Sequence, residues 1–186
     1  NVDLGGGFHV RYNEKDPIFK IEDVKKELDQ CFINSNYELS FEPGRYLIAE
    51  AGLLVTSIIT KKQNGGIDYL IVDAGMNTLL RPAMYNAHHS IEAINNNSNE
   101  KLTYTVAGPI CESSDIFLKN VKLPTQNIDD ILIIKNAGAY GKVMSSNYNS
   151  RILPSEVLVH NDSFGIIFNS EKIEKYIEQD IIPTWL

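Results

Sequence analysis

The sequence predicts an α/β segment followed by an all-β domain. Residues 1–50 read as the last βα units of an α/β (TIM-type) barrel, and residues 51–186 as a β-rich sandwich or barrel with a closing helix. In the first fifty residues, strand patterns flank a helical one, which is typical of parallel α/β structure. After residue 50, short β-branched runs are separated by Gly, Asn or Pro, which is typical of sandwiches and barrels.

The first fifty residues contain one strand–helix–strand unit. NVDL predicts a short strand that leads into three glycines, and YELSFEP predicts a second strand that ends at a proline. Between them, IEDVKKELDQCF has helical spacing, with one face formed by Ile21, Val24, Leu28, Cys31 and Phe32. A complete α/β barrel needs about 250 residues. We therefore expect the N-terminal half of the barrel to be absent from this chain.

The remainder of the chain contains six short strand-like runs: LLVTSIIT, IDYLIVDAG, HSIEAI, LTYTVAG, ILIIKNAGAY and SEVLVHN. Their spacing predicts an antiparallel sheet. The polar stretch NNNSNE, residues 95–100, predicts an exposed tip, and SEKIEKYIEQDI predicts the closing helix.

Composition excludes several classes of function. The net charge of -7 and a pI near 5.1 argue against a nucleic-acid-binding protein. No apolar run reaches the ~18 residues that a membrane helix needs. With no signal-peptide pattern and only Cys31 and Cys111 as cysteines, we expect the reducing cytoplasm. Adjacent His88 and His89 are poorly placed to share a metal, so we interpret them as structural and expect no metal site.

Two glycine-containing motifs lie near the predicted strand ends. Gly5, Gly6 and Gly7 could let backbone N–H groups approach a phosphate, although a tight turn is an equally good explanation. In EPGR, residues 42–45, the turn would fix a carboxylate and a guanidinium at the active-site face of a barrel. A surface turn whose Glu42 and Arg45 pair with each other explains the same letters.

Three further motifs carry polar or reactive side chains. If RPAMY is helical, Arg81 and Tyr85 share a face, and arginine is well suited to bind a carboxylate; a solvated arginine is the alternative. Tyr140 in NAGAYG could contact a phosphate or a ring, or simply pack at a domain edge. Cys111 and Glu112 follow a Gly-Pro turn, and on its own Cys111 fits a small buried apolar residue.

The order of these motifs is more informative than any one of them. GGG, EPGR, DAGMNTLLRPAMY, GPICES-D, NAGAYG and SNYNSR-P-EVLV follow one another between Val2 and about His160. This succession resembles the diaminopimelate decarboxylases, within the fold-type III pyridoxal-phosphate-dependent decarboxylase family. The resemblance implies an α/β barrel joined to an alanine racemase-like C-terminal β domain. It also implies pyridoxal 5'-phosphate as cofactor and decarboxylation of meso-2,6-diaminopimelate to L-lysine and CO2, the last step of lysine biosynthesis.

The resemblance assigns a role to each matched residue. It implies that Gly5, Gly6 and Gly7 hold the cofactor phosphate, that Glu42 pairs with the pyridine nitrogen, and that Gly44, Arg45 and Tyr140 contact the cofactor. It implies that the amino-acid substrate is bound by Arg45, Arg81, Tyr85, Glu112 and Tyr140. Cys111 matches the proton donor, and a thiol with a reference pKa near 8.5 is mostly protonated at neutral pH.

The resemblance also leaves one residue unmatched. The lysine that binds the cofactor covalently lies upstream of Asn1 in the family, so we expect residues 1–186 alone to be inactive. The family's head-to-tail homodimers imply that Cys111 acts across a subunit interface. Two alternatives stay open: a related ornithine, arginine or carboxynorspermidine decarboxylase, or a non-catalytic homologue that binds a partner. The pairing of Arg81 with Tyr85 argues against the first, and the intact Cys111–Glu112 pair against the second.

Overall fold

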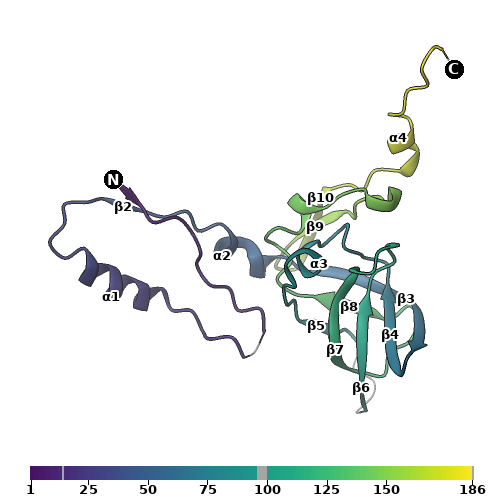
Figure 1. The fold of residues 1–186 in the computed structure, drawn as a ribbon, viewed down its shortest axis with the longest axis horizontal. Helices are drawn as coiled ribbons and strands as arrows, with labels where there is room; N and C mark the ends of the chain where they lie inside the picture. The colour runs from purple at the N-terminus through teal and green to yellow at the C-terminus, as the bar shows by residue number, and fades with distance from the viewer. Residues whose placement is uncertain (14, 96–99, 186) are drawn as a thin grey trace.

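The structure is a computed structural model that describes residues 1–13, 15–95 and 100–185. Of the polar tip predicted at residues 95–100, residues 96–99 lie outside the described residues. Figure 1 shows an N-terminal segment that extends to one side of a sheet domain, with the C-terminus on the other side. No helix of the described part of the chain is long and apolar enough to cross a membrane.

The N-terminal segment contains the predicted strand–helix–strand unit. Strand β1 (Val2–Asp3) pairs in parallel with β2 (Leu39–Ser40), and helix α1 (Ile21–Cys31) lies between them in the chain. No residue of α1 is buried, although its apolar residues have the predicted spacing. A cluster of aromatic rings next to the glycines packs Phe8 against Phe19, Phe41 and Tyr46, with centroids 5.8 Å apart in each pair.

The sheet domain is a six-stranded sheet in the order β5-β8-β3-β4-β6-β7. Its strands are β3 (Leu54–Asn64), β4 (Ile67–Val72), β5 (Ile91–Ala93), β6 (Lys101–Ala107), β7 (Ile116–Pro124) and β8 (Ile131–Ile134). The two edge strands, β5 and β7, approach each other, so the sheet nearly closes into a barrel. Its core includes Ile58, Leu70, Val72, Val106, Leu132 and Ile134, all fully buried. The predicted β-rich domain is confirmed.

Three details of the predicted β-rich domain differ from the structure. The sheet is not wholly antiparallel, because β4 and β6 pair in parallel after a crossover that contains α3 (Arg81–Tyr85) and β5. Two strands were missed, β7 and β10 (Ser163–Phe168). The closing helix α4 covers only Ile173–Ile177, which is shorter than the predicted residues 170–181.

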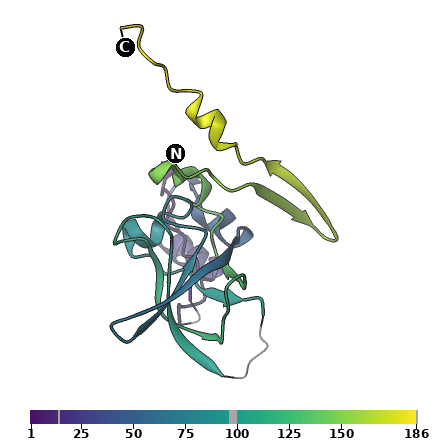
Figure 2. The same cartoon turned by 90° about the vertical axis from the view of Figure 1, so that its right-hand side faces the viewer.

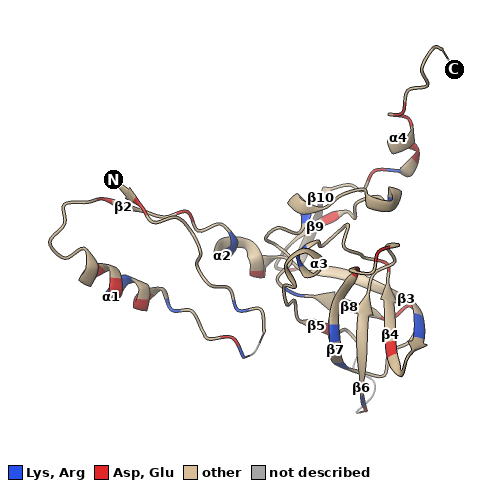
Figure 3. Ribbon diagram, viewed as in Figure 1, with Lys and Arg blue, Asp and Glu red and all other residues tan. Residues whose placement is uncertain are grey.

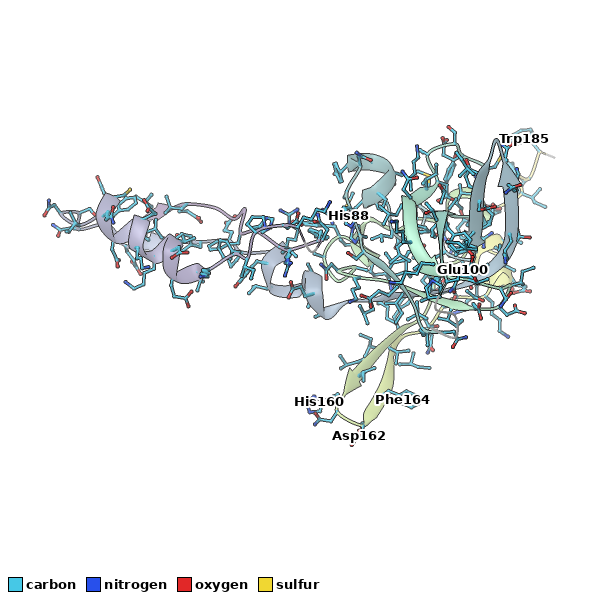
Figure 4. The ribbon with its side chains drawn as sticks, turned by 90° about the horizontal axis from the view of Figure 1, so that it is seen from below. His88, Glu100, His160, Asp162, Phe164 and Trp185 are labelled. Carbon is cyan, nitrogen blue, oxygen red and sulfur yellow. The ribbon has the colours of Figure 1, made fainter. Side chains whose placement is uncertain are left out.

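A hairpin of β9 (Glu156–His160) and β10 projects from the sheet domain (Figure 2). Figure 4 shows His160, Asp162 and Phe164 at its tip, away from the remainder of the molecule. Its apolar side chains are exposed on both strands: Val157, Leu158, Val159, Phe164, Ile166 and Ile167. Two-stranded hairpins are marginally stable in water, so this hairpin needs a covering surface.

Gly52 and Gly138 lie where the N-terminal segment meets the sheet domain, and their backbones are in direct contact. Helix α2 (Arg45–Ile48) and the 3-10 turn η1 (Ala49–Ala51) lead into β3, and a loop after β8 packs directly on their backbone. Gly138 N–H donates to Ala49 O (3.1 Å), and Ala137 N–H donates to Gly52 O (2.8 Å). A Cβ at Gly138 would lie 2.0 Å from Ile48 O and 2.8 Å from Gly52 N. No side chain fits there, since both neighbours are backbone atoms.

We predict that Gly138→Ala lowers the free energy of unfolding by about 2 kcal/mol or more, because the helix and the loop must separate to admit a methyl group. Urea unfolding measures this loss. Gly165→Ala is the matched control, because a Cβ there meets nothing within 4 Å, and we expect it to change stability by less than about 1 kcal/mol. Equal effects of the two substitutions would contradict this account of the joint.

Candidate functional site

The parallel pairing of β1 and β2 places the three glycines against the EPGR turn. Glu42 N–H donates to Gly5 O (2.8 Å), and a Cβ at Gly6 would lie 2.6 Å from Glu42 O. Gly5 and Gly7 have φ values of +70° and +85°, which side-chain-bearing residues rarely adopt. Gly5 N–H already donates to Asp3 Oδ1 (2.7 Å), so Gly6 and Gly7 are the amides that could bind an anion. This glycine turn fits a phosphate group.

The EPGR turn leads directly into α2. Gly44 is the N-cap residue, and Arg45 begins the helix. Figure 3 shows a blue, basic band in the otherwise mostly tan α2, beside the sheet domain. Glu42 is exposed, so its carboxylate is accessible to a ligand. Arg45 is half-buried, with its guanidinium carbon 5.9 Å from the ring centroid of Tyr12. The turn thus presents one accessible anion and one cation that an aromatic ring supports.

Tyr140 also lies near this turn, although it follows β8 and is far from the turn in the chain. Its hydroxyl oxygen lies 3.8 Å from the position of a Cβ at Gly44. Tyr140 has φ +58°, a left-handed conformation that costs a bulky residue about 1–3 kcal/mol. Its ring remains 46% exposed. A strained, accessible tyrosine held beside a candidate binding turn is typical of a functional position.

Arg81 lies at the start of α3, and its side chain is only 6% exposed. Its Nη1 lies 3.0 Å from His89 Nε2, and its guanidinium carbon lies 4.9 Å from the Tyr12 ring centroid. Tyr85 ends the same helix and is 58% exposed. The predicted helix at RPAMY is confirmed, but its two polar residues lie in different surroundings.

His89 is fully buried, and its pKa is lowered from 6.5 to about 4, mainly because burial disfavours the charged ring. The nearby Arg81 charge contributes to this lowering, while a hydrogen bond to the Lys135 carbonyl opposes it. Its ring is therefore neutral at physiological pH. The ring of Tyr12 packs edge-on against it, with centroids 5.1 Å apart.

Cys111 lies on a separate loop between β6 and β7 that Asp115 anchors. The Asp115 carboxylate accepts hydrogen bonds from Ile110 N–H and Met76 N–H, both at 2.7 Å. Burial raises the pKa of Asp115, although these two hydrogen bonds lower it. Cys111 N–H donates to Asn149 Oδ1 (2.9 Å). Cys111 is exposed, and its thiol is free. Three hydrogen bonds thus anchor the loop, and its cysteine is exposed.

Glu112 follows Cys111 directly in the chain and is ionised at neutral pH. Hydrogen bonds from Ser114 and Ser113 lower its pKa, because they stabilise the carboxylate. Ser114 N–H and Ser113 Oγ both lie 3.3 Å from Glu112 Oε1. A fully exposed carboxylate of this kind can bind a cation that approaches the loop.

The structure therefore places most of the predicted site residues in two groups, and Tyr85, exposed at the end of α3, belongs to neither. One group runs without interruption from the glycine turn through Glu42, Gly44, Tyr140 and Arg45 to Arg81. The other is the loop with Cys111 and Glu112. No hydrogen bond, ion pair or ring contact of the described residues joins the two groups.

Sequence reasoning missed three residues that organise these groups, Tyr12, Asp115 and Asn149, and it interpreted His89 as structural without connecting it to Arg81. Tyr12 and His89 contact Arg81 from positions that no sequence spacing connects with it. Only the position of Asp115, a few residues after Cys111 in a Gly-Pro-containing loop, offered a signal, since short acidic side chains often fix such loops.

Other features do not belong to either group. A pocket of about 450 Å³ lies beside β3, with Asp73, Asn77 and Arg151 among its lining residues, and it includes none of the predicted site residues. Across residues 1–13, 15–95 and 100–185, no three His, Cys, Asp or Glu side chains gather in a way that could hold a metal ion.

Comparison with known proteins identifies related sequences along the whole chain. The family described as "Pyridoxal-dependent decarboxylase, C-terminal sheet domain" matches residues 19–138. Diaminopimelate decarboxylase of Buchnera aphidicola (subsp. Acyrthosiphon pisum) is 37% identical over 95% of the chain and 47% of the relative. That of Zymomonas mobilis is 37% identical over 100% of the chain and 44% of the relative. The chain thus spans less than half the length of these relatives.

Solved structures agree with the sequence matches. Diaminopimelate decarboxylase from M. jannaschii in co-complex with L-lysine superposes with a TM-score of 0.90 at 35% identity, covering 99% of this chain and 43% of that one. The enzyme from Helicobacter pylori complexed with L-lysine gives 0.86 at 37% identity, covering 95% and 44%. The chain belongs to the pyridoxal-dependent decarboxylases, contains their C-terminal sheet domain, and is homologous to diaminopimelate decarboxylases along its length.

Proposed function

We propose that this chain is part of a diaminopimelate decarboxylase, which converts meso-2,6-diaminopimelate to L-lysine and CO2. The main support for this proposal is that Arg81 is buried without a carboxylate beside it in the described part of the chain. It is a buried cation, and among the described residues no carboxylate pairs with it. A buried cation without an opposite charge nearby is costly, and a substrate carboxylate would offset that cost. Diaminopimelate keeps a carboxylate at its far end, whereas ornithine has none.

The glycine turn and the EPGR turn fit pyridoxal phosphate. Gly6 and Gly7 would hold the phosphate, because no hydrogen bond from either N–H to another described residue is formed. The Glu42 carboxylate would hold a proton on the pyridine nitrogen, and Tyr140 would contact the group from the side of Gly44. When bound, pyridoxal phosphate supplies the electron sink for the loss of carbon dioxide.

The Cys111 loop would complete the reaction. After carbon dioxide leaves, the Cys111 thiol would donate a proton to the substrate carbon that carried the carboxyl group. The ionised Glu112 beside it would bind the ammonium group at the far end of the substrate. Because both cysteines of the chain are free, the thiol is available in a reducing compartment such as the cytoplasm.

The separation of the two groups supports a shared site in a homodimer. The Cys111 loop contacts none of the residues that the cofactor would use within the described chain, and it faces outward. A second subunit whose cofactor turns meet this loop would bring the two groups together.

We predict that the full-length protein with pyridoxal phosphate releases carbon dioxide from meso-diaminopimelate, with a kcat/KM at least about 100-fold above that for ornithine. Ornithine would leave the Arg81 charge unpaired. Residues 1–186 alone serve as the control and should release none, because no lysine of this chain matches the family's cofactor lysine. Comparable turnover of ornithine would favour a related decarboxylase, and no turnover of any amino acid a non-catalytic homologue.

We predict that Cys111→Ala lowers kcat by about 100-fold or more, because the proton donor is lost. Mixing this variant with a subunit that lacks the cofactor lysine should restore up to half of the wild-type activity, since one site of each mixed dimer is then whole. Cys31→Ala, which removes the other exposed thiol, is the matched control. A verified heterodimer without restored activity would mean that the thiol acts within its own subunit.

A further inference from the structure

The contact between Arg81 and His89 is compatible with one protonation state of the histidine. A guanidinium can only donate hydrogen bonds, so His89 Nε2, 3.0 Å from Arg81 Nη1, must be the acceptor. A carbonyl can only accept, so His89 Nδ1, 2.9 Å from Lys135 O, must carry the proton. The two contacts together select the neutral Nδ1–H tautomer.

The sheet domain fixes the position of this ring. Lys135 follows directly after β8, and its N–H donates to Ser90 O (2.9 Å), next to His89 in the chain. Ser90 Oγ donates to Tyr12 O (2.8 Å), which secures the tyrosine whose ring packs against both Arg81 and His89. The histidine therefore joins the strand end, the N-terminal segment and the arginine.

We propose that His89 is a positioning residue for Arg81, which holds the guanidinium in place while leaving its full positive charge available to a substrate carboxylate. This inference rests on the proposed function. A neutral imidazole occupies one N–H donor and adds no negative charge, so the other donors and the charge of Arg81 remain for the ligand. An aspartate or glutamate in the same place would also orient the arginine, but it would neutralise the charge and compete with the substrate.

The first test compares the steady-state kinetics of full-length variants with diaminopimelate as substrate. We expect His89→Leu, which has no acceptor, and His89→Glu, which supplies a competing carboxylate, each to raise KM by about tenfold with little change in kcat. His89→Gln should keep KM within about threefold of wild type, because a neutral amide also offers an acceptor for Arg81 and a donor for the Lys135 carbonyl.

His88→Gln is the matched control, because His88 is the neighbouring histidine and is exposed. Figure 4 labels His88 on the sheet domain, where the N-terminal segment meets it. We expect this substitution to leave KM, kcat and cofactor affinity unchanged. If His89 only stabilised the fold, His89→Leu would lower kcat, cofactor retention and stability together, and His89→Gln would not restore KM.

The second test does not depend on activity. In protein labelled with ¹⁵N-histidine, the His89 ring should give the nitrogen shifts of a neutral imidazole protonated at Nδ1 between pH 6 and pH 8. A ring protonated at Nε2 or at both nitrogens would overturn the proposal, because it could not accept a hydrogen bond from Arg81.

The outcomes separate this inference from the function on which it rests. Wild-type turnover of diaminopimelate with KM unaffected by His89→Leu and His89→Glu would overturn the inference alone. A wild-type protein that does not act on diaminopimelate would remove both the proposed function and the positioning role.

Discussion

The parallel pairing of β1 with β2 is the constraint on which the candidate site depends. It aligns the ends of two short strands, so the glycine turn and the EPGR turn begin at the same level. The Glu42 N–H bond to Gly5 O and the close approach at Gly6 then leave no room for a side chain. The positions of Gly44 and Arg45 depend on this pairing, because α2 begins where the EPGR turn ends.

A second constraint connects that turn to the sheet domain. The backbone contact between Gly138 and α2 sets Tyr140 beside Gly44, and the Tyr12 ring lies near both Arg45 and Arg81. One phenol ring thus supports two cations that come from elements far apart in the chain. The loop with Cys111 has its own anchor in Asp115, which explains how the thiol can be fixed without contact with the cofactor turns.

Local patterns in the sequence were sufficient for some elements and not for others. Helix α1 was predictable because its apolar residues follow the helical period, and the order of motifs pointed to the family. Strand β7 was missed because its alternation breaks at Lys119 and Asn120, where Asn120 has φ +57° and the register shifts. The parallel pairing of β4 with β6, and the contact of Arg81 with His89, depend on distant segments that no local pattern connects.

The affinity of full-length protein carrying Gly6→Ala for pyridoxal phosphate shows whether the junction of the glycine turn and the EPGR turn holds the cofactor. We expect the affinity to be weaker by about tenfold or more, because a methyl group at this position would meet Glu42 O and force the two turns apart. Gly165→Ala, in the exposed hairpin, should bind the cofactor as wild type does. Wild-type affinity in the Gly6→Ala protein would contradict the claim that the junction of these two turns holds the cofactor.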